Sequence, residues 1–380
     1  MLSRLRTPAH AELPSVGPDE VVVTFTTGGD ERVSTRVGDH ETSTTGPQHV
    51  ARITGLEPDT TYELEVEGVA PGDFLAEHVR TLERPSGRLV ATVATANDVH
   101  FGEARCGITG FPEIDEAGPI FTAEPGDDPY PEVMSRSAIA EMRALAPDAV
   151  VVKGDLTDTG SEEQYAAFLA AYGVFGDDLF HVRGNHDAMI SPTMAIEDTP
   201  YSIELDGVTL AVLDTVIPGT DSGQLSADQV RWLDDLGNAA TGPVIVFGHH
   251  HCWNVDSADA HATRDRPYFG IQPVDSEALV ATFARHDNLV GYFAGHTHTN
   301  RVRRFAATGS RPFAEVGCTK DYPGAWAEYR VYEGGFTQVM HRVTAPDAFA
   351  WAEKTRHMIG GAYGSLVFGG LEHRCFTQQF

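Results

Sequence analysis

A short apolar run rich in β-branched residues, Ala149 to Val152, constrains the fold of this chain more than any other stretch. Such a run is typical of a strand buried on both faces of a parallel sheet. Gly154 then ends the strand and lets the backbone turn, so Asp155 is expected at the carboxyl end of the sheet. Ligands bind at that edge of open α/β sheets, but a Gly-Asp pair there is also a common turn or helix cap. Alone, the pair does not decide between these alternatives.

Strand and helix patterns alternate from about residue 88 to residue 342, which predicts an α/β domain. Strands are expected at 89–95, 149–153, 179–182, 243–247 and 289–294. Helices are expected at 135–145, from Ser161, from Ser226 and at 276–285, with capping boxes at the two serines. A hairpin is expected at 201–214, and antiparallel strands at 301–342. The C-terminal extension 343–380 has no predicted role.

The side-chain charges argue against several kinds of partner. The 380 residues include 55 acidic and 27 basic side chains, which gives a formal net charge of -28. Such a field repels nucleic acid and anionic membranes, so neither is expected as a partner. It would also repel a small anionic substrate unless bound cations reverse the sign locally.

The cysteines and the N-terminus indicate a reduced, cytoplasmic protein. Cys106, Cys252, Cys318 and Cys375 form no C-x-x-C pair, so neither a zinc knuckle nor a dense disulfide framework is expected. The first residues lack the apolar core of a signal peptide. No apolar run approaches the roughly 20 residues of a membrane helix. The oligomeric state is not predicted.

Residues 12–83 have a different sequence pattern from the rest of the chain. Apolar and polar residues alternate over 21–26 and 62–66, and turn signals lie between these stretches. Short threonine-rich strands without a helical period predict a small all-β sandwich. The run 53–66, with Leu56 and Tyr62, resembles the fibronectin type III signature. Nothing in this segment has catalytic spacing, so a packing or interaction module is expected.

Clusters of histidine, aspartate and asparagine follow five of the predicted strands. In chain order they hold Asp98 and His100, Asp155, Asn185 and His186, the histidines 249–251, and His296 and His298. Imidazole with carboxylate is the ligand set of Zn, Mn and Fe, and these donors are too many for one ion. Two ions roughly 3.5–4 Å apart can clamp a phosphoryl group. Asp155, central in the order, is the natural bridging carboxylate.

The order D-x-H, G-D-x-x-D, G-N-H-D, G-H and G-H-x-H resembles the calcineurin-like metallophosphoesterases over about residues 89–341. The resemblance implies a four-layer α/β/β/α sandwich with a dinuclear site on the strand ends. It implies Asp155 as the ligand that bridges two divalent metal ions. The other implied ligands are Asp98, His100 and His298 for the first ion, and Asn185, His249 and His296 for the second.

The resemblance also implies two catalytic residues in the G-N-H-D motif. His186 would hydrogen-bond the phosphate and help to protonate the leaving oxygen. Asp187 would orient the His186 ring, as carboxylates fix imidazole tautomers. His249 follows the glycine as the family ligand does, but His250 competes with it because the triplet leaves the register ambiguous.

A small β-sandwich ahead of such a domain is also similar to purple acid phosphatases, but two departures argue against that branch. Their metal-binding tyrosine would fall where this chain has Asp158, and their first motif lacks a histidine where this chain has His100. The ligand set is similar instead to that of cyclic-nucleotide and glycerophosphodiester phosphodiesterases, with divalent Mn, Fe or Zn.

Substrate choice is expected to come from the loops 101–131 and 252–270. The second loop holds His261, Arg264 and Arg266, which would meet a phosphate or merely offset the local acidity.

Three functional hypotheses follow. The first is a metallophosphoesterase that hydrolyses a small phosphodiester by in-line attack of a hydroxide bridging two ions. The second is a phosphomonoesterase that uses the same site. The third is a non-catalytic, metal-stabilised binding module, against which the retained His186 argues, because a scaffold needs no leaving-group acid.

Overall fold

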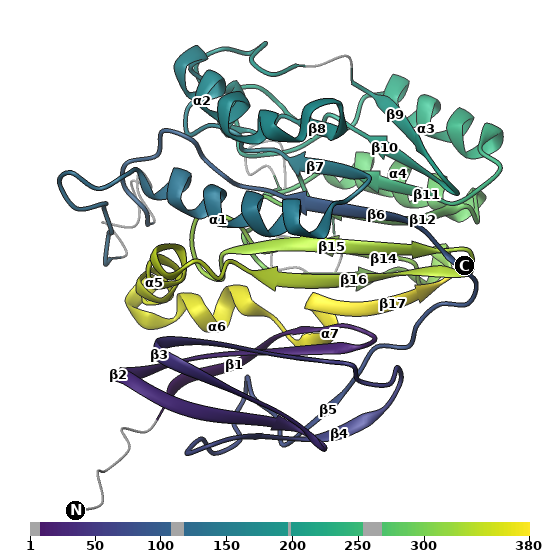
Figure 1. The fold of residues 1–380 in the computed structure, drawn as a ribbon. Coiled ribbons are helices and arrows are strands. Elements are labelled where there is room, and N and C mark those ends of the chain that lie inside the picture. The colour runs from purple at the N-terminus through teal and green to yellow at the C-terminus, as the bar shows by residue number, and fades with distance from the viewer. Residues whose placement is uncertain (1–7, 108–117, 197–198, 254–267) are drawn as a thin grey trace, which may run out of the picture.

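Two six-stranded sheets pack face to face in the computed structural model, and an antiparallel β unit lies at the N-terminal end (Figure 1). The structure describes residues 8–107, 118–196, 199–253 and 268–380. Part of each loop from which substrate choice was expected lies outside these ranges, at 108–117 and 254–267. His261, Arg264 and Arg266 belong to the second of these stretches and lie outside the described residues.

One sheet is built around the buried apolar run that begins at Ala149. β7 (Ala149–Lys153) is buried along its whole length between the parallel strands β6 (Leu89–Ala96) and β8 (Leu179–Val182). Beyond β6 the sheet continues antiparallel through β15 (Ala325–Tyr332), β16 (Gly335–Arg342) and β17 (Cys375–Gln379). The three strands predicted at 89–95, 149–153 and 179–182 are confirmed, because buried parallel strands are continuous apolar runs.

The second sheet has parallel strands in its centre and antiparallel strands at both edges. Its centre consists of β10 (Val208–Val212), β11 (Val244–Phe247), β12 (Leu289–Ala294) and β14 (Pro312–Glu315). Its edges are β9 (Tyr201–Leu205) and β13 (Arg301–Arg304). The hairpin predicted at 201–214 is confirmed as β9 and β10. The antiparallel strands predicted at 301–342 are confirmed, because β13 pairs with β14 and β15 with β16, and β14 also pairs with β12 in parallel.

Helices cover the outer face of each sheet, which makes four layers, α/β/β/α (Figure 1). α1 (Tyr130–Leu145) and α2 (Glu162–Tyr172) pack on the first sheet, and α3 (Ala227–Ala239) and α4 (Pro273–Arg285) pack on the second. The predicted four-layer class is confirmed. In the described part of the chain, no helix combines the length and the apolar character that crossing a membrane requires.

The N-terminal unit consists entirely of antiparallel strands. Its members are β1 (Ala9–Val16), β2 (Glu20–Val37), β3 (His40–Thr54), β4 (Thr61–Val66) and β5 (His78–Arg80). Its apolar core also includes Val339 of β16 and Cys375 of β17, so the unit packs directly on the first sheet. The all-β character agrees with the sequence, whereas the resemblance to fibronectin type III and the boundaries 12–83 stay predictions.

The C-terminal residues 343–380 are part of the fold around the first sheet. They form α5 (Pro346–Thr355), α6 (Tyr363–Phe368), α7 (Leu371–Arg374) and the edge strand β17. β17 pairs with β16 over five residue positions, from Gly335 opposite Gln379 to Val339 opposite Cys375. The division at residue 342 stays a prediction, but the extension supplies a strand that the sequence did not reveal.

Candidate metal centre

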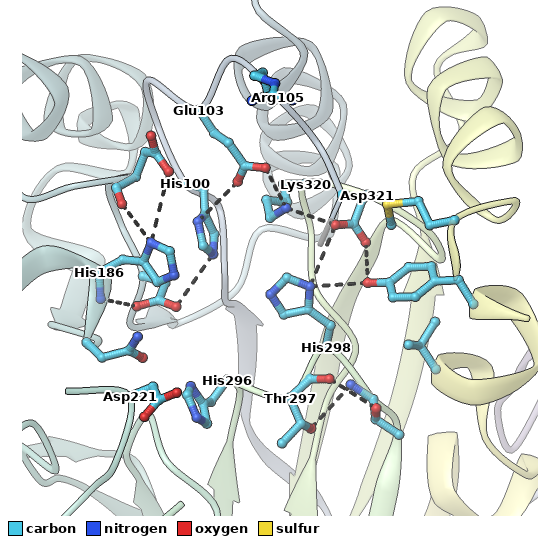
Figure 2. A pocket seen from close by; sticks show the side chains of 18 of the residues that line it. His100, Glu103, Arg105, His186, Asp221, His296, Thr297, His298, Lys320 and Asp321 are labelled. Carbon is cyan, nitrogen blue, oxygen red and sulfur yellow. Dashed lines mark hydrogen bonds and ion pairs between the residues drawn. The ribbon is translucent and has the colours of Figure 1, made fainter. Parts of the chain in front are cut away.

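The five polar clusters follow β6, β7, β8, β11 and β12 at their carboxyl ends, and residues of four of these clusters line one cavity of about 770 Å³ (Figure 2). The histidines 249–251 are buried beside it. Asp155 lies at the centre of the cluster. Its Oδ1 is 3.3 Å from His249 Nε2, and its Oδ2 is 3.5 Å from His100 Nε2. On the far side of His100, Asp98 Oδ1 is 3.5 Å from His298 Nε2. The candidate site therefore lies at the sheet edge that the buried strand predicted.

Several of these donors have a backbone conformation that residues with side chains rarely adopt. Positive φ angles occur at Asp98 (52°), His100 (45°), Asp155 (49°), His296 (71°) and His298 (56°). Each such residue costs on the order of 1–3 kcal/mol and persists only where its surroundings hold it. This clustering of strain is typical of a functional site.

Glycines beside the donors let neighbouring loops touch. Gly154 has a φ of +84°, and a Cβ there would overlap the His249 ring. Gly184 has no such φ, but a Cβ on it would overlap the backbone nitrogen and carboxylate of Asp155. The glycines in the G-D and G-N-H-D motifs are therefore required by close packing between the strand ends.

Asp98, His100 and His298 form one group, whose potential ligand atoms all lie within 4.8 Å of one another. Both ring nitrogens of His100 are buried; Nδ1 faces Glu103 Oε2 at 3.2 Å, and Nε2 makes no hydrogen bond with a described residue. Burial, aided by the nearby His186, holds the pKa of His100 well below its usual value, so its ring is neutral. A neutral, buried imidazole with a free nitrogen beside a carboxylate fits a divalent cation.

His249, His250 and His296 form a second group within the same 4.8 Å limit. Nε2 of His250 and of His296 is buried without a partner among the described residues. Burial also holds the pKa of both these rings well below the usual value. Two neutral imidazoles with free nitrogens again fit a cation.

The ring of His249 differs from that of His250 in its neighbours. His249 Nε2 is 3.1 Å from Asn185 Oδ1 and faces Asp155, and its Nδ1 is 2.9 Å from the Lys153 carbonyl. Burial opposes protonation of His249, but Asp155 outweighs it and raises the pKa of His249 to about 9. His249 thus joins Asn185 and Asp155, whereas His250 Nδ1 lies 2.8 Å from Thr215 Oγ1. The geometry favours His249, and His250 stays a further candidate through its Nε2.

The contact predicted between Asp187 and the His186 ring is wrong. His186 Nδ1 lies 2.6 Å from the carbonyl of Asp158 instead. The Asp187 carboxylate is buried and accepts hydrogen bonds from the backbone of Leu156, Thr157 and Gly184. It therefore joins the G-D and G-N-H-D loops, because adjacent residues point in different directions. Burial and then the nearby Asp155 raise the pKa of Asp187 to about 6.

Four residues that line the cavity were not predicted from the sequence: Glu103, Lys320, Asp321 and Tyr363. Glu103 follows His100 by three residues, the only local hint. The other three lie far along the chain from the metal motifs, in the loop between β14 and β15 and in α6. Their side chains reach His100 and His298 only through the fold (Figure 2).

A family model described as calcineurin-like phosphoesterase matches residues 91–300, which is more than half of the chain. The chain belongs to the calcineurin-like phosphoesterase family. The match includes all five clusters of the candidate metal centre, so the family assignment made from the motifs is confirmed.

Curated relatives match over part of the chain. A cAMP/cGMP dual specificity phosphodiesterase of Mycobacterium tuberculosis, MT0825, is 32% identical over 145 residues, which are 34% of this chain and 44% of that protein. Glycerophosphodiester phosphodiesterase GpdQ of Enterobacter lignolyticus is 28% identical over 174 residues, 42% of this chain and 59% of that protein. The chain spans about half the length of these relatives.

Among solved structures, a dimetal phosphatase from Danio rerio superimposes with a TM-score of 0.51 at 15% sequence identity. The superposition covers 67% of this chain and 98% of that one. At this identity the likeness concerns the fold alone, and it agrees with the four layers of the calcineurin-like phosphoesterase family.

Proposed function

We propose that this family member is a dinuclear-metal phosphodiesterase that hydrolyses a small phosphate diester. The observation that carries the proposal is the position of Asp155, whose two carboxylate oxygens face one imidazole from each side of the site, His249 and His100. A carboxylate placed in this way suits two cations held side by side. When bound, the two ions would lower the pKa of a coordinated water and neutralise charge on the phosphoryl oxygens.

The chain supplies a complete set of donors for two ions. Asp98, His100 and His298 would hold the first ion, Asn185, His249 and His296 would hold the second, and Asp155 would contact both. The mixed imidazole and carboxylate donors favour Mn, Fe or Zn. The bound cations would also give an anionic substrate a positive site on a protein of net charge -28.

His186 is placed to exchange a proton with the substrate. Its side chain is partly exposed in the cavity, and its ring centroid is 4.4 Å from that of His100. The Asp158 carbonyl occupies Nδ1, which leaves Nε2 for the leaving oxygen. General acid catalysis of this kind contributes roughly 10²–10⁴ in rate.

A diester is favoured over a monoester by the size and the lining of the cavity. About 770 Å³ leaves room beyond one phosphate, and Met358, Ile359 and Leu366 add an apolar wall. Two matched relatives are named as phosphodiesterases, which supports the same choice. Phosphomonoesterase activity at the same site is the alternative. A cytoplasmic location and the lack of nucleic-acid or membrane partners stay predictions.

The test compares hydrolysis of bis(p-nitrophenyl) phosphate with that of p-nitrophenyl phosphate. Metal-stripped protein is assayed with and without added Mn(II), beside Asp155→Ala and the control Asp206→Ala. Asp206 is an exposed turn residue paired with Arg88 outside the cavity. We expect metal-dependent diester turnover that is lost only in Asp155→Ala. A strong monoester preference would favour the phosphatase, and an inactive protein that binds no metal would contradict the proposal.

A further inference from the structure

A buried chain of charged groups lies behind two of the proposed metal ligands, His100 and His298 (Figure 2). Lys320 Nζ lies 3.0 Å from Glu103 Oε1 and 3.0 Å from Asp321 Oδ2. The side chains of all three residues are at most 10% exposed. An ion chain so far from water requires a specific geometry, because each charge loses its hydration.

Both carboxylates of this chain face the outer nitrogen of a proposed ligand. Glu103 Oε2 is 3.2 Å from His100 Nδ1, and Asp321 Oδ2 is 3.6 Å from His298 Nδ1. The Tyr363 hydroxyl lies 3.2 Å from the same His298 nitrogen and donates to Asp321 Oδ1 over 2.8 Å. The opposite nitrogen of each ring, Nε2, points toward an aspartate of the metal centre.

We propose that Glu103, Lys320, Asp321 and Tyr363 form a clasp that sets the orientation and tautomer of His100 and His298, and so controls the affinity of one of the two metal ions. The inference rests on the proposed function, in which these two histidines bind an ion together with Asp98. These are positioning residues, since they act on the metal through the two imidazoles.

The clasp acts by fixing which ring nitrogen of His100 and of His298 carries the hydrogen atom. A carboxylate or a hydroxyl oxygen at Nδ1 favours the tautomer that carries its hydrogen there, which leaves the lone pair of Nε2 for a cation. Lys320 holds the two carboxylates at fixed positions, because its ammonium group bridges them. Burial opposes its charge, but its anionic neighbours outweigh this and keep the pKa of Lys320 well above its usual value.

Two histidines of the second group have other partners at Nδ1. His249 Nδ1 contacts the backbone carbonyl of Lys153, and His250 Nδ1 contacts the Thr215 hydroxyl. Among the contacts of the described residues, the clasp reaches His100 and His298 and no histidine of the second group. Loss of the clasp should therefore weaken the binding of one metal ion and leave the binding of the other unchanged.

Most of the clasp lies beyond the segment that defines the family. The family match ends at residue 300, whereas Lys320, Asp321 and Tyr363 follow it. Tyr363 comes from α6, within the C-terminal residues for which the sequence predicted no role. Through Tyr363, the C-terminal segment thus takes part in positioning a metal ligand.

The experiment measures Mn(II) binding by calorimetry and by the magnetic coupling between two Mn(II) ions in electron paramagnetic resonance spectra. The variants are Glu103→Gln and Asp321→Asn, which keep the side-chain shape, and the gentler Tyr363→Phe. We expect wild type to bind two ions and the first two variants to bind one of them 10–100-fold more weakly. At Mn(II) concentrations that saturate wild type, the resonance signal of two coupled Mn(II) ions should be weaker in these two variants than in wild type. Tyr363→Phe should show a smaller shift in the same direction.

Glu328→Gln is the matched control, because it also removes charge from a buried carboxylate that pairs with a cation, Arg330, and contacts the His341 ring. Its side chain does not line the cavity, so both ions should bind as in wild type. Two ions bound with wild-type affinity in Glu103→Gln and Asp321→Asn would overturn the clasp, and so would equal weakening of both ions. If Tyr363→Phe is the only variant that folds, unchanged binding in it overturns the clasp. A wild-type protein that binds no Mn(II) would instead overturn the proposed function.

Discussion

Single residues decide how closely the loops of this site approach one another. Gly184 lies against Asp155 without space for a Cβ, and Asp187 then ties the two loops through three backbone hydrogen bonds. Asp155 itself keeps a positive φ of 49°. The position of the central carboxylate therefore depends on packing around it as much as on its own chemistry.

Gly184→Ala is expected to destabilise the fold by about 1–3 kcal/mol, because the added methyl group must displace Asp155 or its loop. The affinity of Gly184→Ala for Mn(II) should also be lower than that of wild type. Gly173→Ala is the control: no heavy atom lies within 4 Å of a Cβ there, and its φ of -59° suits alanine. Urea denaturation of the metal-free proteins checks this, and equal stability of the two variants would contradict it.

His186→Ala is expected to reduce kcat by about 10²–10⁴ for a diester with an alkyl leaving group, and by much less for a p-nitrophenyl ester. The reason is that p-nitrophenolate leaves without a proton, whereas an alkoxide needs one. Steady-state kinetics on both esters, with metal content measured in parallel, checks the role. An equal loss of kcat on the two esters would show that His186 acts in another way.

Sequence motifs predicted the candidate donors, which the fold brings together, but did not predict the residues that contact them. Asp98, His100, Asp155 and the later histidines stand directly after apolar runs, so their place at the sheet edge follows from strand order. Lys320 and Tyr363 reach the site from distant loops, and no spacing in the sequence brings them there. The error on Asp187 arose because neighbours in a motif need not touch.

At the scale of elements, the predicted strands were those with the strongest apolar runs. β17 and the parallel pairing of β14 with β12 were missed, because both depend on which strand lies beside them rather than on local pattern. The capping box at Ser161 was half right. Ser161 Oγ accepts from the Gln164 backbone, but the Gln164 side chain accepts from Thr159 and not from Ser161.

Ser161→Ala and Ser226→Ala are expected to cost about 1 kcal/mol of unfolding free energy each, because both serines cap a helix through a 3.2 Å bond. Ser161 begins α2, which directly follows the loop of Asp155 and Asp158, whereas Ser226 begins α3, which directly follows none of the five polar clusters. We therefore expect weaker Mn(II) binding in Ser161→Ala alone. Chemical denaturation and calorimetry test the pair; a similar loss of Mn(II) affinity in Ser226→Ala would contradict the link to α2.

At the scale of the whole molecule, the N-terminal unit is joined to the rest of the chain by buried ions. Glu12 of β1 is within 2.9 Å of Arg342 and 2.8 Å of Arg356, and it accepts from the Tyr322 hydroxyl. Tyr322 directly follows Asp321 of the clasp. The acidic composition of the chain gave no hint of this junction, because it depends on one carboxylate among 55 acidic side chains.

Glu12→Gln should therefore destabilise the protein by about 3 kcal/mol, at the lower end of the cost of breaking a buried pair, because Arg342 and Arg356 keep Glu353 as a partner. Glu65→Gln is the matched control, since it removes the same charge from the same unit. The Glu65 side chain is 59% exposed and pairs with Arg36, so its loss should cost at most about 1 kcal/mol. Urea denaturation measures both changes, and limited proteolysis should release the N-terminal unit faster from Glu12→Gln alone. Equal stability of the two variants would mean that the apolar contacts of Val339 and Cys375, rather than the ions, hold the unit in place.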